Sequence, residues 1–591
     1  MNPVAASPPA TIRARIHESA VRRVTRAYGG TLADIFTEAL QNSRRAGAAR
    51  VRISAAALTG RPHETAGAGE VQYTVAIADD GMGIADPAVL LSFGENGWDE
   101  ATVRREDAAG FGFASLARRG CAVSSRPRST DGSVSPGWKV ELAPEHFLGE
   151  AEATIHTDEA APWPHGTAIS FRATEAFAAI RTAAENAARH YPLPVVFGNG
   201  EDGEAAADAP LPRRAFLDGA VHAEPWRGLV FGVFRNRHPG YNDPDLNFYG
   251  LALPVRLPTV ETVHGATWTA RADIDDCPDL ELVLPARKEA VENGFLTEMR
   301  GAARLAVYRA MAAEPSPRPA FEDRQRAHEA GIGIAPPPAI LRPWRPSVAN
   351  VNDWRDPPKL AEAGHDALVM ACDPEPPEAQ ALWRAAERAG VASRLFEADR
   401  RLEGYGWYDA LDRVTAVNVR VAADGEWMTI GDYPVPERPR LRAAVLPARP
   451  AAIRIELAVR PLSGPPATLD LATDLAFAGE AWSWVEDALP LVTADSALQP
   501  HELAGLLAAA FFSPSEEADA DSWETQRERF DESALHLATR LLLSDDAACR
   551  TSLAEAVRRE LLWLCPQDRN VDIRIRRPDI AVTLEDAAPA P

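Results

Sequence analysis

Two polar residues one helical turn apart could act together on a phosphate. Apolar residues recur at helical spacing through segment 32–48, which predicts a helix with Glu38 and Asn42 on one face. A carboxylate can orient a water for attack on a terminal phosphate, and an amide oxygen can bind Mg²⁺. The same two residues would also suit the solvent-facing stripe of an amphipathic helix, so the pair alone does not decide between these interpretations.

A second chemical signal follows a predicted strand. Residues 71–78 are rich in β-branched side chains and end at Asp79-Asp80-Gly81-Met82-Gly83. A carboxylate at a strand end can accept a hydrogen bond from an adenine amino group, and Gly81 and Gly83 let the backbone approach the base. Ile84 offers an apolar wall. An ordinary Asp-Gly turn is the alternative interpretation.

Glycines also precede a third element. Gly110-Phe111-Gly112-Phe113 stands before residues 114–118, which we expect to begin a helix whose N-terminal N–H groups could bind an anion. The polar run 92–107 has the composition of a mobile lid over a bound nucleotide. Later, His165-Gly166-Thr167 leads into the apolar run 168–171, a predicted strand.

These four segments, in this order and spacing, resemble the GHKL ATPase superfamily, which includes DNA gyrase, the ninety-kilodalton heat-shock chaperones, histidine kinases, and the MutL and MORC proteins. The resemblance implies a Bergerat-type α/β sandwich, with helices on one face of a mixed sheet, that uses ATP and Mg²⁺. It makes Glu38 the general base, Asn42 the Mg²⁺ ligand and Asp79 the adenine reader, supported by Thr167. The other ATP-binding residues it implies are Gly81, Gly83, Ile84, Gly110, Phe111, Gly112 and Phe113.

One position departs from the family pattern. Segment 38–48 has the same frame as MutL-type proteins, which carry Asp where this chain has Arg45. In those proteins that Asp usually lies near the metal. The substitution therefore brings metal geometry and turnover rate into question, although it leaves the pocket itself unaffected.

A basic pair further along the chain could complete the site. Segment 284–293 is similar to the catalytic loop in the middle domain of the heat-shock chaperones. By this resemblance Arg287, or else Lys288, would reach the γ-phosphate and stabilise the charge that develops there. A solvated basic pair at a helix start is the alternative.

Composition limits the classes of function. A chain of 591 residues is expected to form roughly three or four domains. The net charge of −23 disfavours a nucleic-acid clamp, because phosphate binding is mostly electrostatic. The five cysteines form no Cys-x-x-Cys pair, and no apolar run is long enough to span a membrane. We expect a cytoplasmic protein that does not bind membranes.

Composition also suggests domain boundaries in an α/β multidomain chain. We expect the ATP-binding domain with its linker at 1–212, an α+β transducer or middle domain at 213–315, and a Pro-rich linker at 316–345. The mixed α+β region 346–591 could form two subdomains, 346–465 and 466–591. Within these regions we predict strands at 228–234, 280–284, 414–421, 451–459 and 573–582, a helix at 296–311, a βαβ unit at 367–398 and a helical tail at 501–564. We expect four tryptophans of this region in a core: Trp482, Trp484, Trp523 and Trp563.

The leading hypothesis is an ATP-hydrolysing conformational machine, chaperone-like, that closes as a homodimer on ATP and acts on a protein partner. A MutL- or MORC-like DNA clamp in repair or in defence against mobile DNA is the first alternative, suggested by the Arg-rich segment 13–26 and the frame at 38–48. A slow or inactive nucleotide-gated scaffold is the second, suggested by Arg45. No endonuclease motif or phospho-acceptor helix is apparent.

Overall fold

The computed structural model has a mixed α/β architecture in two compact units, Met1–Pro336 and Pro337–Pro591. Their boundary lies within the Pro-rich segment 316–345. The structure describes residues 30–58, 72–92, 98, 102, 112–129, 131–157, 164–199, 208–236, 244–283, 289–349, 356–433, 449–478, 488–517, 520–566 and 569–586. Within these ranges, no helix is both long and apolar enough to cross a membrane. All five cysteines are free thiols.

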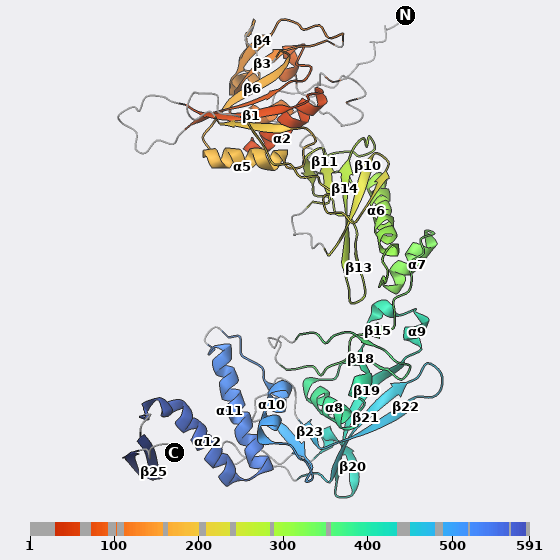
Figure 1. Ribbon diagram of the computed structural model, residues 1–591, viewed down its shortest axis with the longest axis vertical. Coiled ribbons are helices and arrows are strands. Elements are labelled where there is room, and N and C mark those ends of the chain that lie inside the picture. The colour runs from red at the N-terminus through yellow and green to blue at the C-terminus, as the bar shows by residue number, and fades with distance from the viewer. Residues whose placement is uncertain are drawn as a thin grey trace, which may run out of the picture. The chain divides into compact units, whose positions relative to one another are not determined.

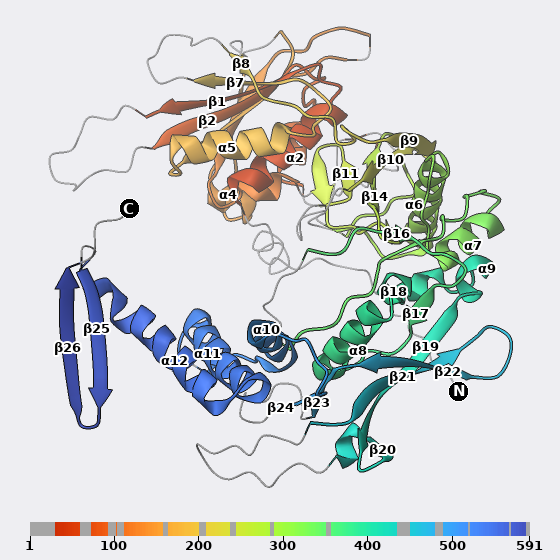
Figure 2. The ribbon, with the colours of Figure 1, turned by 60° about the horizontal axis from the view of Figure 1, so that its bottom comes forward.

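The first unit begins with an eight-stranded mixed sheet in the order β5-β4-β3-β6-β2-β1-β7-β8. Only β1 and β7 pair in parallel. Helices α2 and α5 lie on the same face of this sheet (Figures 1 and 2). The elements are α2 (Leu32–Arg45), β1 (Val51–Ala57), β2 (Tyr73–Asp79), η1 (Pro87–Leu90), η2 (Gly112–Leu116), β3 (Cys121–Arg126), β4 (Trp138–Leu142), α4 (Pro144–Phe147), β5 (Ile155–Thr157), β6 (Gly166–Ala173), α5 (Phe177–Ala188), β7 (Val195–Asn199) and β8 (Ala209–Pro210).

Alternating burial along the strands explains this layer arrangement. In β1, Val51, Ile53 and Ala55 are buried, whereas the residues between them are not. They pack in one core with the apolar stripe of α2, which includes the fully buried Phe36. Each such large side chain contributes about 1.5–3 kcal/mol on burial. This core holds α2 against the sheet.

A second sheet completes the first unit, in the order β12-β11-β14-β10-β9, with β13 also paired to β14. Helix α6 packs on it, and Met299, Ala303 and Val307 are fully buried. Residues 321–329, inside the predicted Pro-rich linker, form α7, and Ala327 is buried in the same core. The elements are β9 (His222–Trp226), β10 (Leu229–Arg235), β11 (Leu246–Phe248), β12 (Leu251–Leu253), β13 (Thr259–Glu261), β14 (Thr267–Ile274), α6 (Gly294–Ala312) and α7 (Phe321–Glu329).

The second unit has a sheet in the order β18-β17-β19-β21-β22, with β20 paired to β19, followed by three helices and a hairpin (Figure 2). Its strands are β15 (Ile340–Leu341), β16 (Ala361–Glu362), β17 (Leu368–Met370), β18 (Leu395–Glu397), β19 (Asp412–Ala423), β20 (Glu426–Thr429), β21 (Ala452–Arg460), β22 (Ala467–Thr473), β23 (Leu475–Ala478), β24 (Leu489–Val492), β25 (Arg569–Arg576) and β26 (Asp579–Asp586). Its helices are α8 (Pro376–Arg388), η3 (Ala392–Arg394), η4 (Arg400–Leu402), α9 (Gly406–Asp409), η5 (Ile430–Asp432), α10 (Pro500–Phe511), α11 (Trp523–Leu542), α12 (Asp545–Glu560) and η6 (Leu562–Leu564).

Most predicted elements are confirmed, including the parallel β17-α8-β18 unit and the helical tail. The helix expected to begin at 114–118 is present only as a short 3₁₀ turn and does not continue as an α-helix. The five-residue 3₁₀ helix η2 occurs there, and Gly120, at φ +69°, follows soon after it. The strand predicted at 280–284 is wrong, because in its described part only an isolated bridge between Leu282 and Ala290 forms.

The chain end also differs from its prediction. Segment 573–582 is not one strand, because the chain turns at Arg577–Pro578 and β25 pairs antiparallel with β26. Proline favours the turn, since it has no N–H group to give to a ladder. Trp563 is 77% exposed and so is not a core residue, and Trp523 is 37% exposed beside Phe512.

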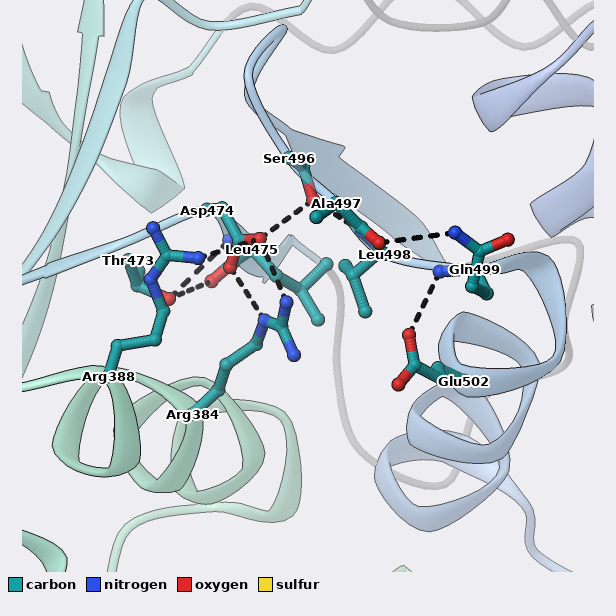
Figure 3. A network of polar contacts seen from close by, with 10 residues as sticks. All are labelled: Arg384, Arg388, Thr473, Asp474, Leu475, Ser496, Ala497, Leu498, Gln499 and Glu502. Atoms are coloured by element: carbon teal, nitrogen blue, oxygen red, sulfur yellow. Dashed lines mark hydrogen bonds and ion pairs between the residues drawn. The ribbon is translucent and has the colours of Figure 1, made fainter.

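A buried carboxylate joins several parts of the second unit (Figure 3). Asp474 lies between β22 and β23, and its side chain is only 2% exposed. Arg384 of α8 donates to both carboxylate oxygens at 2.6 and 2.8 Å, Arg388 lies at 3.1 Å, and the Ser496 hydroxyl donates at 2.7 Å. Burial raises the pKa of Asp474, but these hydrogen bonds and positive charges outweigh it and lower the pKa to about 2.

We expect Asp474→Ala to destabilise the second unit by about 3 kcal/mol, because it leaves two arginines beside an empty site. The measurement is hydrogen exchange of segment 376–388 in the full chain, which should become faster. The control is Asp470→Ala, whose carboxylate is 51% exposed and lies 3.6 Å from Arg454. It should have little effect. Equal exchange in the two variants would contradict this assignment.

The lowered pKa also fixes the direction of a pH effect. A carboxyl whose pKa falls on folding stabilises the protein above its unfolded pKa of 3.8, and this contribution is lost as the pH falls toward 2. The difference in urea stability between wild type and Asp474→Ala should therefore be full at neutral pH and shrink toward pH 2. A difference that stays constant over this range would contradict the prediction.

Candidate functional site

Helix α2 carries the residues that the sequence singles out first. Thr31 and Asp34 form a capping box that fixes its start. Glu38 and Asn42 line one small cavity of about 10 Å³, which also has Ile35, Ala39, Ile77, Phe113, Ser115, Leu116 and Ile169 in its wall. This volume is close to that of a single water molecule. A nucleotide would therefore enter only if neighbouring segments such as η2 moved.

Asp79 lies at the end of β2 and is 8% exposed. One carboxylate oxygen accepts a hydrogen bond from the Gly81 N–H at 2.9 Å, and the other lies 3.0 Å from the Ser43 hydroxyl. Burial raises the pKa of Asp79, and the hydrogen bonds from Gly81 and Ser43 offset part of the rise. Ser43 directly follows Asn42, so α2 connects the cavity residues to this carboxylate.

The backbone around Asp79 leaves no room for side chains. A Cβ on Gly81 would lie 2.7 Å from the Cβ of Ala46, and one on Gly166 would lie 2.0 Å from the Asp79 carbonyl oxygen. Gly166 also has a φ of +121°, which favours glycine. Close approach of the chain at these positions therefore requires glycine.

Neighbouring strands support the same turn. Thr167 of β6 is the register partner of Asp79, and its hydroxyl lies 3.1 Å from the Ser125 hydroxyl. Ser125 in turn accepts a hydrogen bond from the Ile84 N–H at 2.8 Å. Gly83, at φ +73°, lies between Gly81 and Ile84 in this turn. The ends of β2, β3 and β6 thus bring the predicted residues of the Asp-Gly and Gly-Thr segments together.

Several predicted residues lie outside the described ranges. They are Gly110, Phe111, Arg287, Lys288, Trp482 and Trp484, together with most of the predicted lid at 92–107. Gly112 begins η2, and Phe113 lines the cavity with Glu38 and Asn42. The described part of the site therefore consists of α2, η2 and the ends of β2, β3 and β6.

The arrangement at Asn42 does not suit Mg²⁺. Its amide oxygen, the atom that would bind a metal, accepts a hydrogen bond from Nη1 of Arg45 at 3.0 Å. Two unit charges 4 Å apart repel by about 4 kcal/mol at an effective dielectric constant of 20, and a divalent ion roughly doubles this cost.

Sequence reasoning missed three polar contacts of the site. Ser43 and Ser125 lie against Asp79 and Thr167, and the His165 ring lies 2.9 Å from the Gly81 carbonyl oxygen. In the sequence, only the position of Ser43 within a predicted helix could have indicated such a contact. Ser43 stands inside a helix, where a buried serine usually bonds to a carbonyl or to a neighbouring element.

The other side of α2 contacts the second sheet of the same unit. Gln41 donates to the carbonyl oxygens of Phe248 and Tyr249 at 3.3 and 2.8 Å, and the Arg44 guanidinium lies 3.5 Å from the centre of the Tyr249 ring. Tyr249 has a φ of +52°. One helix therefore contacts both the candidate site and the second sheet.

We expect Gln41→Leu to weaken this contact by about 1–3 kcal/mol, because two buried carbonyl groups would lose their donor. Hydrogen exchange of segment 246–253 should become faster in the full chain. Gln325→Leu is the control, since Gln325 bonds to Glu329 on the exposed surface of α7. Unchanged exchange in Gln41→Leu would show that the contact does not stabilise this segment.

Neither a protein-family model nor a curated protein matches the chain. Among solved structures, the chain is similar to the N-terminal domain of a DNA repair protein, with 11% identity over 48% of this chain and 97% of that chain, at a TM-score of 0.27. It is also similar to the B subunit of DNA gyrase from Myxococcus xanthus, with 12% identity over 49% and 95% of the two chains, at a TM-score of 0.29. Because both TM-scores are below 0.5, these similarities carry no argument about function.

Proposed function

We propose that residues 1–212 of the first unit form a GHKL-type ATPase domain that binds ATP and hydrolyses its terminal phosphate. The observation that carries the proposal is that α2 places Glu38 and Asn42 in the wall of a cavity and, through Ser43, contacts Asp79, the buried carboxylate at the end of β2. A buried carboxylate with a raised pKa, at the end of a strand that also lines a cavity with a second carboxylate in its wall, is typical of a functional site.

Each residue has a distinct role in the proposed reaction. Asp79 accepts a hydrogen bond from the adenine amino group, and the side chains of Ile77 and Ile169 provide apolar walls. Glu38 orients a water and takes its proton as the water oxygen bonds to the γ-phosphorus. The bond to the β–γ bridging oxygen breaks, and ADP leaves with the electron pair. Because Mg²⁺ does not fit at Asn42, no step is assigned to it.

The basic pair at 287–288 and the net charge extend this proposal beyond the cavity. Arg287, with Lys288 as second candidate, would stabilise charge on the γ-phosphate. ATP would close two copies into a homodimer that acts on a protein partner. The net charge of −23 supports a protein rather than a nucleic acid as that partner.

A second candidate function is a nucleotide-gated scaffold with slow or no turnover. The contact between Arg45 and the Asn42 amide oxygen favours it, because it removes the predicted metal ligand from the reaction. In this case ATP would still bind and change the conformation of the chain, but the bond between its β- and γ-phosphates would not be hydrolysed.

Phosphate release by the full chain, with and without duplex DNA at low ionic strength, tests the proposal. We expect turnover that duplex DNA does not change. Stimulation by DNA would favour the MutL- or MORC-like clamp instead, and saturable ATP binding without phosphate release would favour the scaffold. If the chain neither binds ATP nor releases phosphate, the assignment of the site is contradicted.

A further inference from the structure

Asn42 has a single amide oxygen, and that oxygen is engaged by a cation of the chain itself. Nη1 of Arg45 donates to it at 3.0 Å. The NH₂ group of Asn42 is a donor, and a divalent cation on the second lone pair of the oxygen would lie beside the positive guanidinium and be repelled by it. A positively charged guanidinium therefore already lies where a divalent cation would contact this side chain.

The helix fixes this contact. Arg45 follows Asn42 by three residues, so the two side chains lie one turn apart on the same face of α2. Arg45 is also in the last turn, where the helix dipole favours a positive charge. Asn42 lines the cavity beside Glu38. The guanidinium therefore lies at the edge of the candidate site, and it bonds there to a residue of its own helix.

We propose that Arg45 supplies the positive charge that a divalent cation would otherwise bring to this cavity, so that the site binds a nucleoside triphosphate without Mg²⁺. This inference rests on the proposed function. A guanidinium presents five donors in a planar fork that matches phosphate oxygens. It can keep its bond to Asn42 while another N–H group meets a phosphate.

The neighbouring arginine provides a matched control. Arg44 has the same charge and lies in the same turn of α2, but its guanidinium stacks on the Tyr249 ring at 3.5 Å, against the second sheet. A general effect of removing positive charge from α2 would appear in both variants. A specific role at the cavity would appear in Arg45→Ala alone.

The experiment is a calorimetric titration of ATP into the full chain, once with Mg²⁺ and once with EDTA. We expect wild-type dissociation constants in the two buffers to agree within about threefold, whereas Arg45→Ala should weaken binding in EDTA roughly ten- to a hundredfold. Arg44→Ala should bind like the wild type. Arg45→Asp, which frees the Asn42 oxygen and adds a carboxylate, should bind more tightly with Mg²⁺ than with EDTA.

The outcomes separate this inference from the proposed function. Wild-type binding that weakens tenfold or more in EDTA would overturn the metal-free inference and leave ATP binding intact. Equal affinity of Arg45→Ala and wild type in EDTA would overturn it as well. If ATP shows no saturable binding in either buffer, the proposed function itself is overturned. If Arg45→Ala fails to fold, the wild-type affinities in the two buffers still show whether ATP binding requires Mg²⁺.

Discussion

Glu38→Gln is expected to reduce ATP turnover roughly 10²–10⁴-fold and to leave ATP affinity nearly unchanged. The substitution keeps the size of the side chain and its place in the cavity wall beside Asn42. It removes the group that accepts the proton of the attacking water. Phosphate release at saturating ATP measures the loss, and a calorimetric titration of ATP measures the affinity.

The control for this variant is Glu185→Gln on the neighbouring helix α5. Glu185 pairs with Arg181 one turn away on the helix surface, at 2.9 Å, and so carries a carboxylate with a structural contact only. Turnover should be unchanged in this control. Wild-type turnover in Glu38→Gln would show that Glu38 is not the base, and equal losses in both variants would point to general damage.

Asp79→Asn is expected to weaken ATP binding by roughly a hundredfold, since a hydrogen bond to a charged group contributes about 1.5–3 kcal/mol. In the wild type both carboxylate oxygens can accept hydrogen bonds, and the Gly81 N–H and the Ser43 hydroxyl already face them. An amide NH₂ in one of these positions would face a donor, and it could not accept from adenine. Titration of ATP into the variant measures the loss.

The adjacent residue offers a close comparison. Asp80 accepts hydrogen bonds from the backbone N–H groups of Ala49 and Arg50 at 2.7 and 3.1 Å, so it holds a loop. Asp80→Asn should therefore bind ATP like the wild type, with at most a small loss of stability. If both variants bind ATP normally, the carboxylate of Asp79 does not read the base.

Local patterns were sufficient to predict the elements that carry the site. The apolar spacing of 32–48 predicted α2, which begins at Leu32 and ends at Arg45, three residues earlier than expected. The β-branched run before Asp79 predicted β2, which ends at that residue. Both predictions succeeded because helical period and strand composition are properties of neighbouring residues.

Contacts between distant segments could not be predicted in this way. Gln41 meets the carbonyl oxygens of residues more than two hundred positions away, and nothing near Gln41 in the sequence indicates this. The contact between Arg45 and Asn42 is local, but the sequence shows only that the two residues share a face. Whether the arginine points toward the amide oxygen depends on the packing around α2.

Short elements were predicted least well. Gly112 begins η2, and Gly120 at φ +69° follows four residues after its end, so the helical stretch here stays short. A proline turned one predicted strand into the β25–β26 hairpin. The exposure of Trp563 follows from its environment, since α12 before it buries little more than Ala548. Aromatic content alone could not indicate that this end of the chain lacks a deep core.

The most direct test of the central claim is a titration of ATP, and separately of GTP, into the full wild-type chain. Adenine presents an amino group at the position where guanine presents a carbonyl oxygen, so in the same orientation only adenine can donate to the Asp79 carboxylate there. We predict one saturable ATP site per chain, with GTP at least about tenfold weaker. Equal affinity for the two nucleotides would contradict the role of Asp79, and no saturable binding of either would contradict the nucleotide site as a whole.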